Sequence, residues 1–302
     1  MQTRKDKLDL LAVSFLIGFN VLLGLNQALV KLVNDGFSPL LQGGLRSACA
    51  FLPVLIFAIV MRRRLSVTDG SLPWGILNGL FFSIEFGLLF IALDYSTVAR
   101  VSLFFYMMPV WVTIAAHFSI PEEPLNRNKV VGLSLAVIGV AIGFGGNLGE
   151  AGEDAWLGDL LALLAGMFWA AIAMLTRLKL SHVSSEMNLL YQLFVSGILL
   201  TLLALCVGDP VREPTAMIYG ILAFQVIAIV SIGFLVWFWI LSTYPVSSMA
   251  SFSLLTPIFG VFFGWQIFDD AVTPALGIAL LLAGAGIVLI NRPAAAKRAG
   301  VL

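Results

Sequence analysis

The chain is a succession of apolar stretches, each about as long as a membrane-spanning helix, separated by short polar turns. A helix needs about 20 mostly apolar residues to cross the hydrocarbon core of a bilayer. Hydrophobic residues make up 60% of the 302 residues, charged residues make up 11%, and the mean hydropathy is +1.01. A soluble fold of this length would have no means of burying so much apolar surface. The sequence therefore predicts an integral membrane protein with the lipid bilayer as its surroundings.

The breaks between the stretches carry turn-forming or charged residues, as at Asn34-Asp35-Gly36 and Gly208-Asp209-Pro210. Together, breaks and stretches predict an all-α protein with ten transmembrane helices. The expected spans lie near residues 9–31, 38–60, 72–93, 98–119, 128–144, 156–178, 185–206, 217–241, 247–268 and 272–290.

Lysine and arginine concentrate on one side of this predicted bundle, which is typical of the cytoplasmic side. Both termini are therefore predicted to be cytoplasmic, in agreement with an even number of helices. The segments on the termini's side hold Arg4, Lys5, Lys7, Arg62, Arg63, Arg64, Arg127, Lys129, Arg177, Lys179, Arg292, Lys297 and Arg298, whereas the other side holds Lys31, Arg100 and Arg212.

The two halves of the chain share a layout. Residues 95–123 can be laid over residues 244–270, so that a tyrosine, small residues, a mid-helix proline and an acidic pair recur in the same order. The predicted repeats are residues 1–146 and 147–302, within one membrane domain. Because five is an odd number of helices, the second copy must be inverted across the membrane relative to the first. Inverted repeats are typical of transporters with a substrate site near the bilayer midplane.

Several short motifs occur in a characteristic order along nearly the whole chain. They are Gly24-Leu25-Asn26 and the more distal Lys31 in the first helix, Arg46 in the second, Phe168-Trp169-Ala170 in the sixth, and small-residue runs that lead to Pro109 and Pro257.

In this pattern the chain resembles the EamA-type branch of the drug/metabolite transporter superfamily, and within it most closely the bacterial amino-acid exporters. The resemblance implies efflux of small metabolites from the cytoplasm through a cavity between the two halves. It also implies a location in a bacterial inner membrane. The chain departs from the common pattern at Leu23, which stands where the family has a tryptophan, and at Asp269-Asp270, which replace a glutamate.

Glu85 lies near the middle of the third predicted helix and is the carboxylate placed deepest in any span. A charge at that depth needs a partner or water. One interpretation is that Glu85 faces the cavity and binds a substrate ammonium group or carries a proton. The other is that it is a protonated or hydrogen-bonded acid that fixes helix packing.

Arg46 lies in the outer half of the second helix, one turn from Gln42. A guanidinium group matches a carboxylate at two points, so Arg46 is a candidate receptor for a substrate carboxylate. Pairing with Glu85, or a structural role with the charge reaching outward, are the alternatives.

Four further polar or aromatic residues are predicted to contact substrate. Asn20 offers an amide near the midplane, although such amides also join helices in lipid. Tyr106 places a hydroxyl on the fourth helix, and Trp169 offers a mid-span ring for stacking on an apolar or aromatic substrate. Gln192 lies in the inner half of the seventh helix. For each, helix packing alone is the alternative.

Pro109 and Pro257 lie in matching helices of the two repeats. A proline inside a helix breaks the backbone hydrogen-bond ladder and frees a carbonyl, which predicts a kink at each position. Paired kinks suit a bending gate, whereas a static bend is the commoner role of proline in membrane helices.

The sequence therefore predicts a secondary transporter, active as a monomer or homodimer, that exports small organic solutes by alternating access. Amino acids with apolar or aromatic side chains are the leading substrates, coupled to protons or not coupled at all. A transporter of nucleotide sugars or phosphorylated metabolites would need several deep cations, and the chain offers Arg46 alone at depth. An intramembrane enzyme or a receptor is the alternative of another class. We expect no enzymatic activity, cofactor or metal, and the balanced net charge argues against a nucleic-acid partner.

Overall fold

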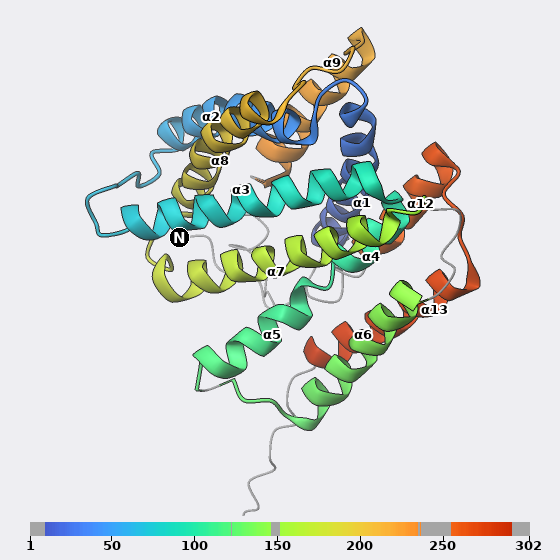
Figure 1. Ribbon diagram of the computed structural model, residues 1–302. Coiled ribbons are helices and arrows are strands. Elements are labelled where there is room, and N and C mark those ends of the chain that lie inside the picture. The colour runs from blue at the N-terminus through green and yellow to red at the C-terminus, as the bar shows by residue number, and fades with distance from the viewer. Residues whose placement is uncertain (1–9, 122, 146–151, 235, 237–254, 292–302) are drawn as a thin grey trace, which may run out of the picture.

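The computed structural model describes residues 10–121, 123–145, 152–234, 236 and 255–291 (Figure 1). Within these ranges the chain is a helical bundle whose β-structure is limited to one isolated bridge between Phe37 and Val211. Its helices are α1 (Leu10–Asn34), α2 (Pro39–Val60), α3 (Leu72–Tyr95), α4 (Val98–Phe105), α5 (Met108–Ser119), α6 (Arg127–Gly145), α7 (Ala155–Lys179), α8 (Ser185–Val207), α9 (Ala216–Phe224), the π-helix η1 (Gln225–Gly233), α12 (Leu255–Phe268) and α13 (Pro274–Asn291).

These helices confirm the all-α, ten-helix fold. Each predicted span coincides with a helix or with two consecutive helical segments, and most ends agree within about two residues. Eight segments of the described chain are long and apolar enough to cross a membrane. The end of the eighth predicted span, the start of the ninth and the predicted boundary between residues 146 and 147 lie outside the described residues.

Local sequence explains where several helices begin. Ser38, Thr97, Ser184 and Thr215 each precede a helix and accept a hydrogen bond from a backbone N–H of its first turn. Such caps satisfy donors that the helix itself leaves free. At the other end of α8, Gly208 has a φ of 138°, which other residues rarely adopt, and the helix stops there.

The fourth and eighth spans are less regular than predicted. The fourth is broken between α4 and α5, so that Pro109 lies in the first turn of a new helix instead of kinking a continuous one. A proline costs no hydrogen bond there, because its missing N–H would be unpaired in any case. The eighth span continues from α9 into the π-helix η1, a form that is rare and often occurs at functional sites.

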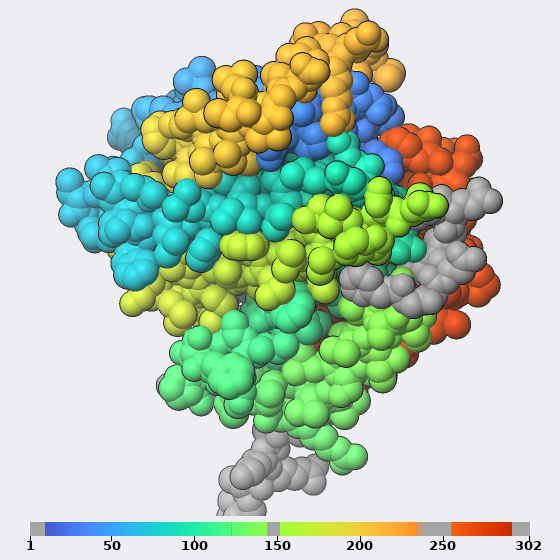
Figure 2. Space-filling view, viewed as in Figure 1, coloured from blue at the N-terminus to red at the C-terminus, as the bar shows by residue number. Residues whose placement is uncertain are grey.

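Matching helices of the two halves pack on each other. The second, fourth and fifth helices of the first half contact their counterparts in the pairs α2 with α8, α4 with α12, and α6 with α13. The first helix of each half also packs on the fourth helix of the other half. Thus α1 contacts α12, and α7 contacts α4 and α5. This is the pattern expected when two repeats are related by a pseudo-two-fold axis. Figure 2 shows α3 and α7 meeting along one face of the bundle.

The α6–α13 pair is held by small residues. A β-carbon added at Gly132 would lie 2.6 Å from the carbonyl oxygen of Gly286, and one added at Gly286 would lie 2.5 Å from that of Gly132. A β-carbon added at Gly139 would lie 2.8 Å from the carbonyl oxygen of Ala279. The small residues that the sequence places on these two helices thus bring them together within one chain, as in other membrane helix pairs.

Candidate functional site

A cavity of about 670 Å³ lies between the two halves. It extends from Gln27 in α1 and Leu89 in α3 to the α7–α8 turn at Ser181. We call the end at the α7–α8 turn the mouth and the opposite end the closed end. Its size is typical of sites for small organic molecules. All eight residues predicted as substrate-binding or gating residues line it: Asn20, Arg46, Glu85, Tyr106, Pro109, Trp169, Gln192 and Pro257.

Arg46 is buried in the wall near the closed end. Its guanidinium group lies 4.5 Å from the ring centroid of Phe86 and 4.7 Å from that of Phe90, and Nη1 donates a 3.3 Å hydrogen bond to Asn26. The two rings hold the cation by cation–π attraction. A guanidinium has five N–H donors, so most of them stay available to a ligand in the cavity. Arg46 thus does not snorkel out of the bundle.

Glu85 lies one helix away from Arg46, on α3. It is 4% exposed, and its carboxyl group forms neither a hydrogen bond nor an ion pair with any residue that the structure describes. Within the described structure, no hydrogen bond or ion pair joins Glu85 to Arg46, although both line the cavity. An acid buried without a partner is costly, which makes Glu85 a candidate for contact with a ligand or water.

Aromatic rings form another part of the wall. The ring of Trp169 stacks on that of Phe105, with centroids 5.0 Å apart and planes 13° apart, and meets the Tyr106 ring edge-on at 5.9 Å. These three side chains come from α4, the α4–α5 break and α7, and so from both halves. They offer a flat apolar surface to a ligand.

Asn20 lines the cavity, but its amide is already engaged. Nδ2 donates to the carbonyl of Leu16 at 2.6 Å, and Oδ1 accepts from the hydroxyl of Thr256 in α12. The amide therefore joins α1 to α12, the packing role that the sequence left open beside substrate contact. Pro257 follows Thr256 in the same wall.

Sequence reasoning missed the polar residues near the mouth. Thr176 and Asn188 line the cavity and, with Asn78, form a cluster between α7, α8 and α3. Asn78 donates to Asn188 at 2.8 Å, and Asn188 donates to Thr176 at 3.2 Å. Their positions near the ends of apolar helices gave no signal that set them apart from interfacial residues. Phe82 and Phe86, also in the wall, are indistinguishable in sequence from other apolar residues.

A buried ion pair lies beyond the closed end. Arg100 of α4 donates to the carboxylate of Asp159 in α7, with Nε at 3.1 Å, and Ser96 donates to the same carboxylate at 2.9 Å. The side chain of Asp159 is 0% exposed and that of Arg100 is 8% exposed. The sequence analysis counted Arg100 only as a basic residue on the side opposite the termini, whereas the structure buries it in an ion pair between the two halves.

Comparison with known proteins agrees with this architecture. The profile of the EamA-like transporter family matches residues 10–144 and again residues 156–292, so the chain contains the family's domain twice. A crystal structure of another protein, 20% identical in sequence, superimposes with a TM-score of 0.64 over 91% of this chain and 94% of that one, which shows a shared fold.

Two relatives are similar along most of their length. The uncharacterized transporter YoaV of Bacillus subtilis is 25% identical over 276 residues, which are 91% of this chain and 94% of the relative. A protein of Escherichia coli named a probable amino-acid metabolite efflux pump is 24% identical over 280 residues, which are 87% and 90% of the two chains. The twofold profile match, the ten-helix bundle and the central cavity place this chain in the EamA-like transporter family.

Proposed function

We propose that this transporter exports amino acids with apolar or aromatic side chains from the cytoplasm by alternating access. The observation that carries the proposal is the presence of two opposite charges, Arg46 and Glu85, in one cavity with no ion pair between them in the described structure. A zwitterion between them would give each buried charge a counter-ion, which a singly charged ligand would not.

Arg46 is the proposed receptor for the substrate carboxylate. The rings of Phe86 and Phe90, at 4.5 and 4.7 Å from the guanidinium, restrict its position, and a guanidinium held in place can bind a carboxylate at two points. Asn26 takes one donor and leaves the others for the ligand.

Glu85 is the proposed partner of the substrate ammonium group. Its carboxyl group has the charge that an ammonium requires, and it lies beside Phe86 on α3, so the same helix presents both the acid and a ring that holds Arg46. Charged hydrogen bonds of this kind contribute about 1.5–3 kcal/mol each.

The stacked rings of Phe105 and Trp169, with Tyr106, are the proposed surface for the substrate side chain. A flat, apolar wall favours aromatic and large aliphatic side chains over charged ones. Gln192, on the mouth side of the cavity, is the proposed polar contact during entry.

The distribution of cations argues against phosphorylated substrates. Among the described residues that line the cavity, Arg46 is the one lysine or arginine. A nucleotide sugar carries at least two phosphate charges, which one cation would leave partly unbalanced in a site of low dielectric. The name of the Escherichia coli relative, a probable amino-acid metabolite efflux pump, also supports amino acids.

The predicted orientation indicates the side from which substrate would reach the cavity in this conformation. With both termini in the cytoplasm of a bacterium, the mouth at the α7–α8 turn faces the cytoplasm and the closed end faces outward. Substrate would then enter from the cytoplasm, bind between Arg46 and Glu85, and leave when the closed end opens.

Uptake by liposomes tests the proposal. Purified protein is reconstituted, and the flux of labelled aromatic, aliphatic, acidic and basic amino acids is measured with and without an imposed pH gradient, against empty vesicles. We expect saturable flux of aromatic and large aliphatic amino acids. Flux without the gradient would indicate facilitated diffusion, whereas flux that requires it would indicate proton coupling. The absence of saturable flux for every amino acid would contradict the proposal.

A further inference from the structure

The cavity stops at one level in three neighbouring helices. Its last lining residues toward the closed end are Gln27 in α1, Arg46 in α2 and Leu89 in α3. One to two turns farther along, the same helices carry polar side chains that bond to one another instead of to a ligand. This second layer separates the cavity from the surface at the closed end.

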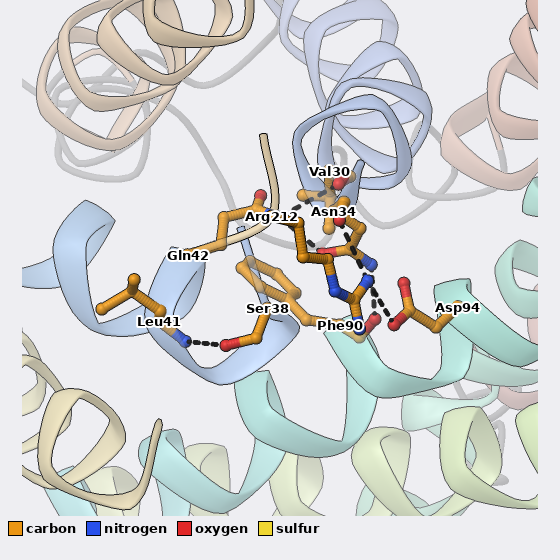
Figure 3. A network of polar contacts seen from close by, with 8 residues as sticks. All are labelled: Val30, Asn34, Ser38, Leu41, Gln42, Phe90, Asp94 and Arg212. Atoms are coloured by element: carbon orange, nitrogen blue, oxygen red, sulfur yellow. Dashed lines mark hydrogen bonds and ion pairs between the residues drawn. The ribbon is translucent and has the colours of Figure 1, made fainter. Parts of the chain in front are cut away.

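The layer is a continuous polar network (Figure 3). Gln42 of α2 donates to Asn34 of α1 at 2.7 Å, and Asn34 donates to the backbone carbonyl of Phe90 in α3 at 2.9 Å. Arg212, on the segment between α8 and α9, donates to the carbonyl of Asn34 at 3.0 Å and pairs with Asp94 of α3 at 3.0 Å. Arg212 belongs to the second repeat and its partners belong to the first.

A short backbone strap reinforces the network. Phe37 and Val211 form an antiparallel bridge between the α1–α2 and α8–α9 segments. The backbone N–H of Arg212 donates to the carbonyl of Gly36 at 2.8 Å. The backbone N–H of Ser38 donates to the carbonyl of Pro210 at 2.9 Å. We call Asn34, Asp94, Arg212 and the paired segments 36–38 and 210–212 the latch.

The latch contrasts with the buried pair between Arg100 and Asp159. The side chains of Arg212 and Asp94 are 43% and 24% exposed, so water can replace their contact at little cost. Separating Arg100 from Asp159 would instead leave two charges uncompensated in the interior. One junction between the halves is therefore easily opened, and the other is built to stay closed.

The latch also reaches the proposed substrate site. The ring of Phe90 lies against the Arg46 guanidinium, and its carbonyl accepts the hydrogen bond from Asn34. Next to this contact, Gln42 Oε1 is fully buried without a hydrogen-bond partner among the described residues. A buried acceptor without a donor is costly, and entry of water on opening would satisfy it. The closed latch is thus not the state in which every polar group is satisfied.

We propose that the latch is the gate at the closed end of the cavity: Asp94, Arg212 and Asn34 separate in every transport cycle, while Arg100 and Asp159 stay paired as the pivot. Arg46 is the link between substrate and gate, because its guanidinium contacts the ring of Phe90, whose carbonyl accepts the hydrogen bond from Asn34. The inference rests on the proposed alternating access, but its test does not depend on the identity of the substrate.

Accessibility of a cysteine tests the gate directly. Leu89→Cys is introduced after replacement of the two natural cysteines, both free and exposed, by Cys49→Ala and Cys206→Ala. A membrane-impermeant maleimide is added from the latch side, with Asp209→Cys as the marker of that side, and mass spectrometry reads the label at position 89. Arg212→Gln and Asp94→Asn are each expected to raise the labelling rate about 10-fold, whereas the exposed control Arg127→Gln leaves it unchanged. Unchanged labelling in both latch variants would overturn the proposal.

A disulfide provides the converse test. In an antiparallel ladder a pair flanked by hydrogen bonds, like Phe37 and Val211, has Cα atoms about 4.5 Å apart, which is compatible with a disulfide. Oxidised Phe37→Cys/Val211→Cys is expected to abolish both labelling of position 89 from the latch side and amino-acid flux, and a reducing agent restores both; Phe37→Cys alone shows neither effect.

Labelling and flux that persist in fully cross-linked protein would overturn the gate. If the unmodified transporter moves no amino acid, the proposed substrate fails, and the labelling experiment still decides the gate.

Discussion

Arg46 and Glu85 lie on the neighbouring helices α2 and α3 and line one cavity, yet no ion pair joins them in the described structure. The two rings of Phe86 and Phe90 hold the guanidinium, and the carboxyl group of Glu85 is left without a hydrogen bond there. This arrangement is the basis for our proposal that the cavity receives a molecule carrying both a carboxylate and an ammonium group.

Glu85→Gln is expected to reduce amino-acid flux about 10- to 100-fold. It removes the charge from the proposed hydrogen bond between Glu85 and the substrate ammonium group, which contributes about 1.5–3 kcal/mol. The side chain keeps its size, so folding should be preserved. Flux into proteoliposomes is the measurement, with size-exclusion profiles as the check on folding. Glu153→Gln changes an exposed acid outside the cavity and serves as the control. Flux at the wild-type level in Glu85→Gln would show that Glu85 does not bind the substrate.

Arg46→Gln is expected to weaken discrimination between an amino acid and its carboxamide. The wild-type protein should prefer the amino acid by at least about 10-fold, since the carboxamide cannot pair with the guanidinium. Competition against labelled substrate measures the preference. Arg46→Lys should restore the charge but only part of the preference, because an ammonium lacks the planar fork. A preference that is the same in all three proteins would exclude carboxylate binding by Arg46.

Trp169→Ala is expected to lower the flux of aromatic amino acids more than that of aliphatic ones, and to change the ratio of the two fluxes by about 2- to 12-fold, because stacking contributes about 0.5–1.5 kcal/mol. Trp169→Phe retains a ring beside Phe105 and should keep most of the ratio. Equal losses for both substrate classes would indicate a packing role instead.

Gly286→Val is expected to destabilise the bundle by about 1–3 kcal/mol, since a β-carbon there would lie 2.5 Å from the carbonyl oxygen of Gly132. The thermal unfolding midpoint in detergent should fall accordingly. Gly277→Ala, on the same helix but with open space around the added carbon, is the matched control and should leave the midpoint unchanged or slightly raised. Equal midpoints for both variants would contradict close packing of α6 on α13.

The contact between the α5–α6 turn and α7 has a definite pH dependence. Arg177 donates a 2.5 Å hydrogen bond to Glu123, and this bond holds the pKa of the Glu123 carboxyl below its ordinary value. A depressed carboxyl pKa stabilises the folded state above the pKa of the unfolded chain, and that stabilisation is lost as the pH falls through the folded pKa.

We therefore expect the Glu123–Arg177 contact to persist at neutral pH and to weaken only in acid below the usual titration range of glutamate. Titration of Glu123 by NMR with selective labelling measures the pKa. Arg177→Gln should return it to the ordinary range, and an unchanged value in that variant would rule out the hydrogen bond as the cause.

The fold was largely predictable because the length and hydrophobicity of each apolar stretch determine whether it forms a membrane span. An apolar run of about 20 residues between turns specifies a span, and all ten predicted spans coincide with helical segments. The eight site residues gather at one cavity for a related reason: polar, aromatic or proline residues deep in a span avoid lipid and turn toward the bundle interior.

What the sequence could not provide depends on contacts between distant segments. The π-helix η1 and the break between Tyr106 and Met107 depend on tertiary packing that overrides local preference. The partners of Arg100 and Arg212 are 59 and 118 residues away in sequence, at Asp159 and Asp94, and nothing in the local pattern distinguishes these arginines from charges in solvent. Predicting the pivot and the latch requires the fold first.

The most direct test of the zwitterion site is competition for uptake of a labelled aromatic amino acid by three unlabelled compounds. They are the same amino acid, its carboxamide, which lacks the carboxylate, and its deaminated acid, which lacks the ammonium. We expect the amino acid to compete well and each singly charged analogue to be at least about 10-fold weaker, because each leaves Arg46 or Glu85 without a counter-ion. Equal competition by either analogue would contradict recognition of both charges.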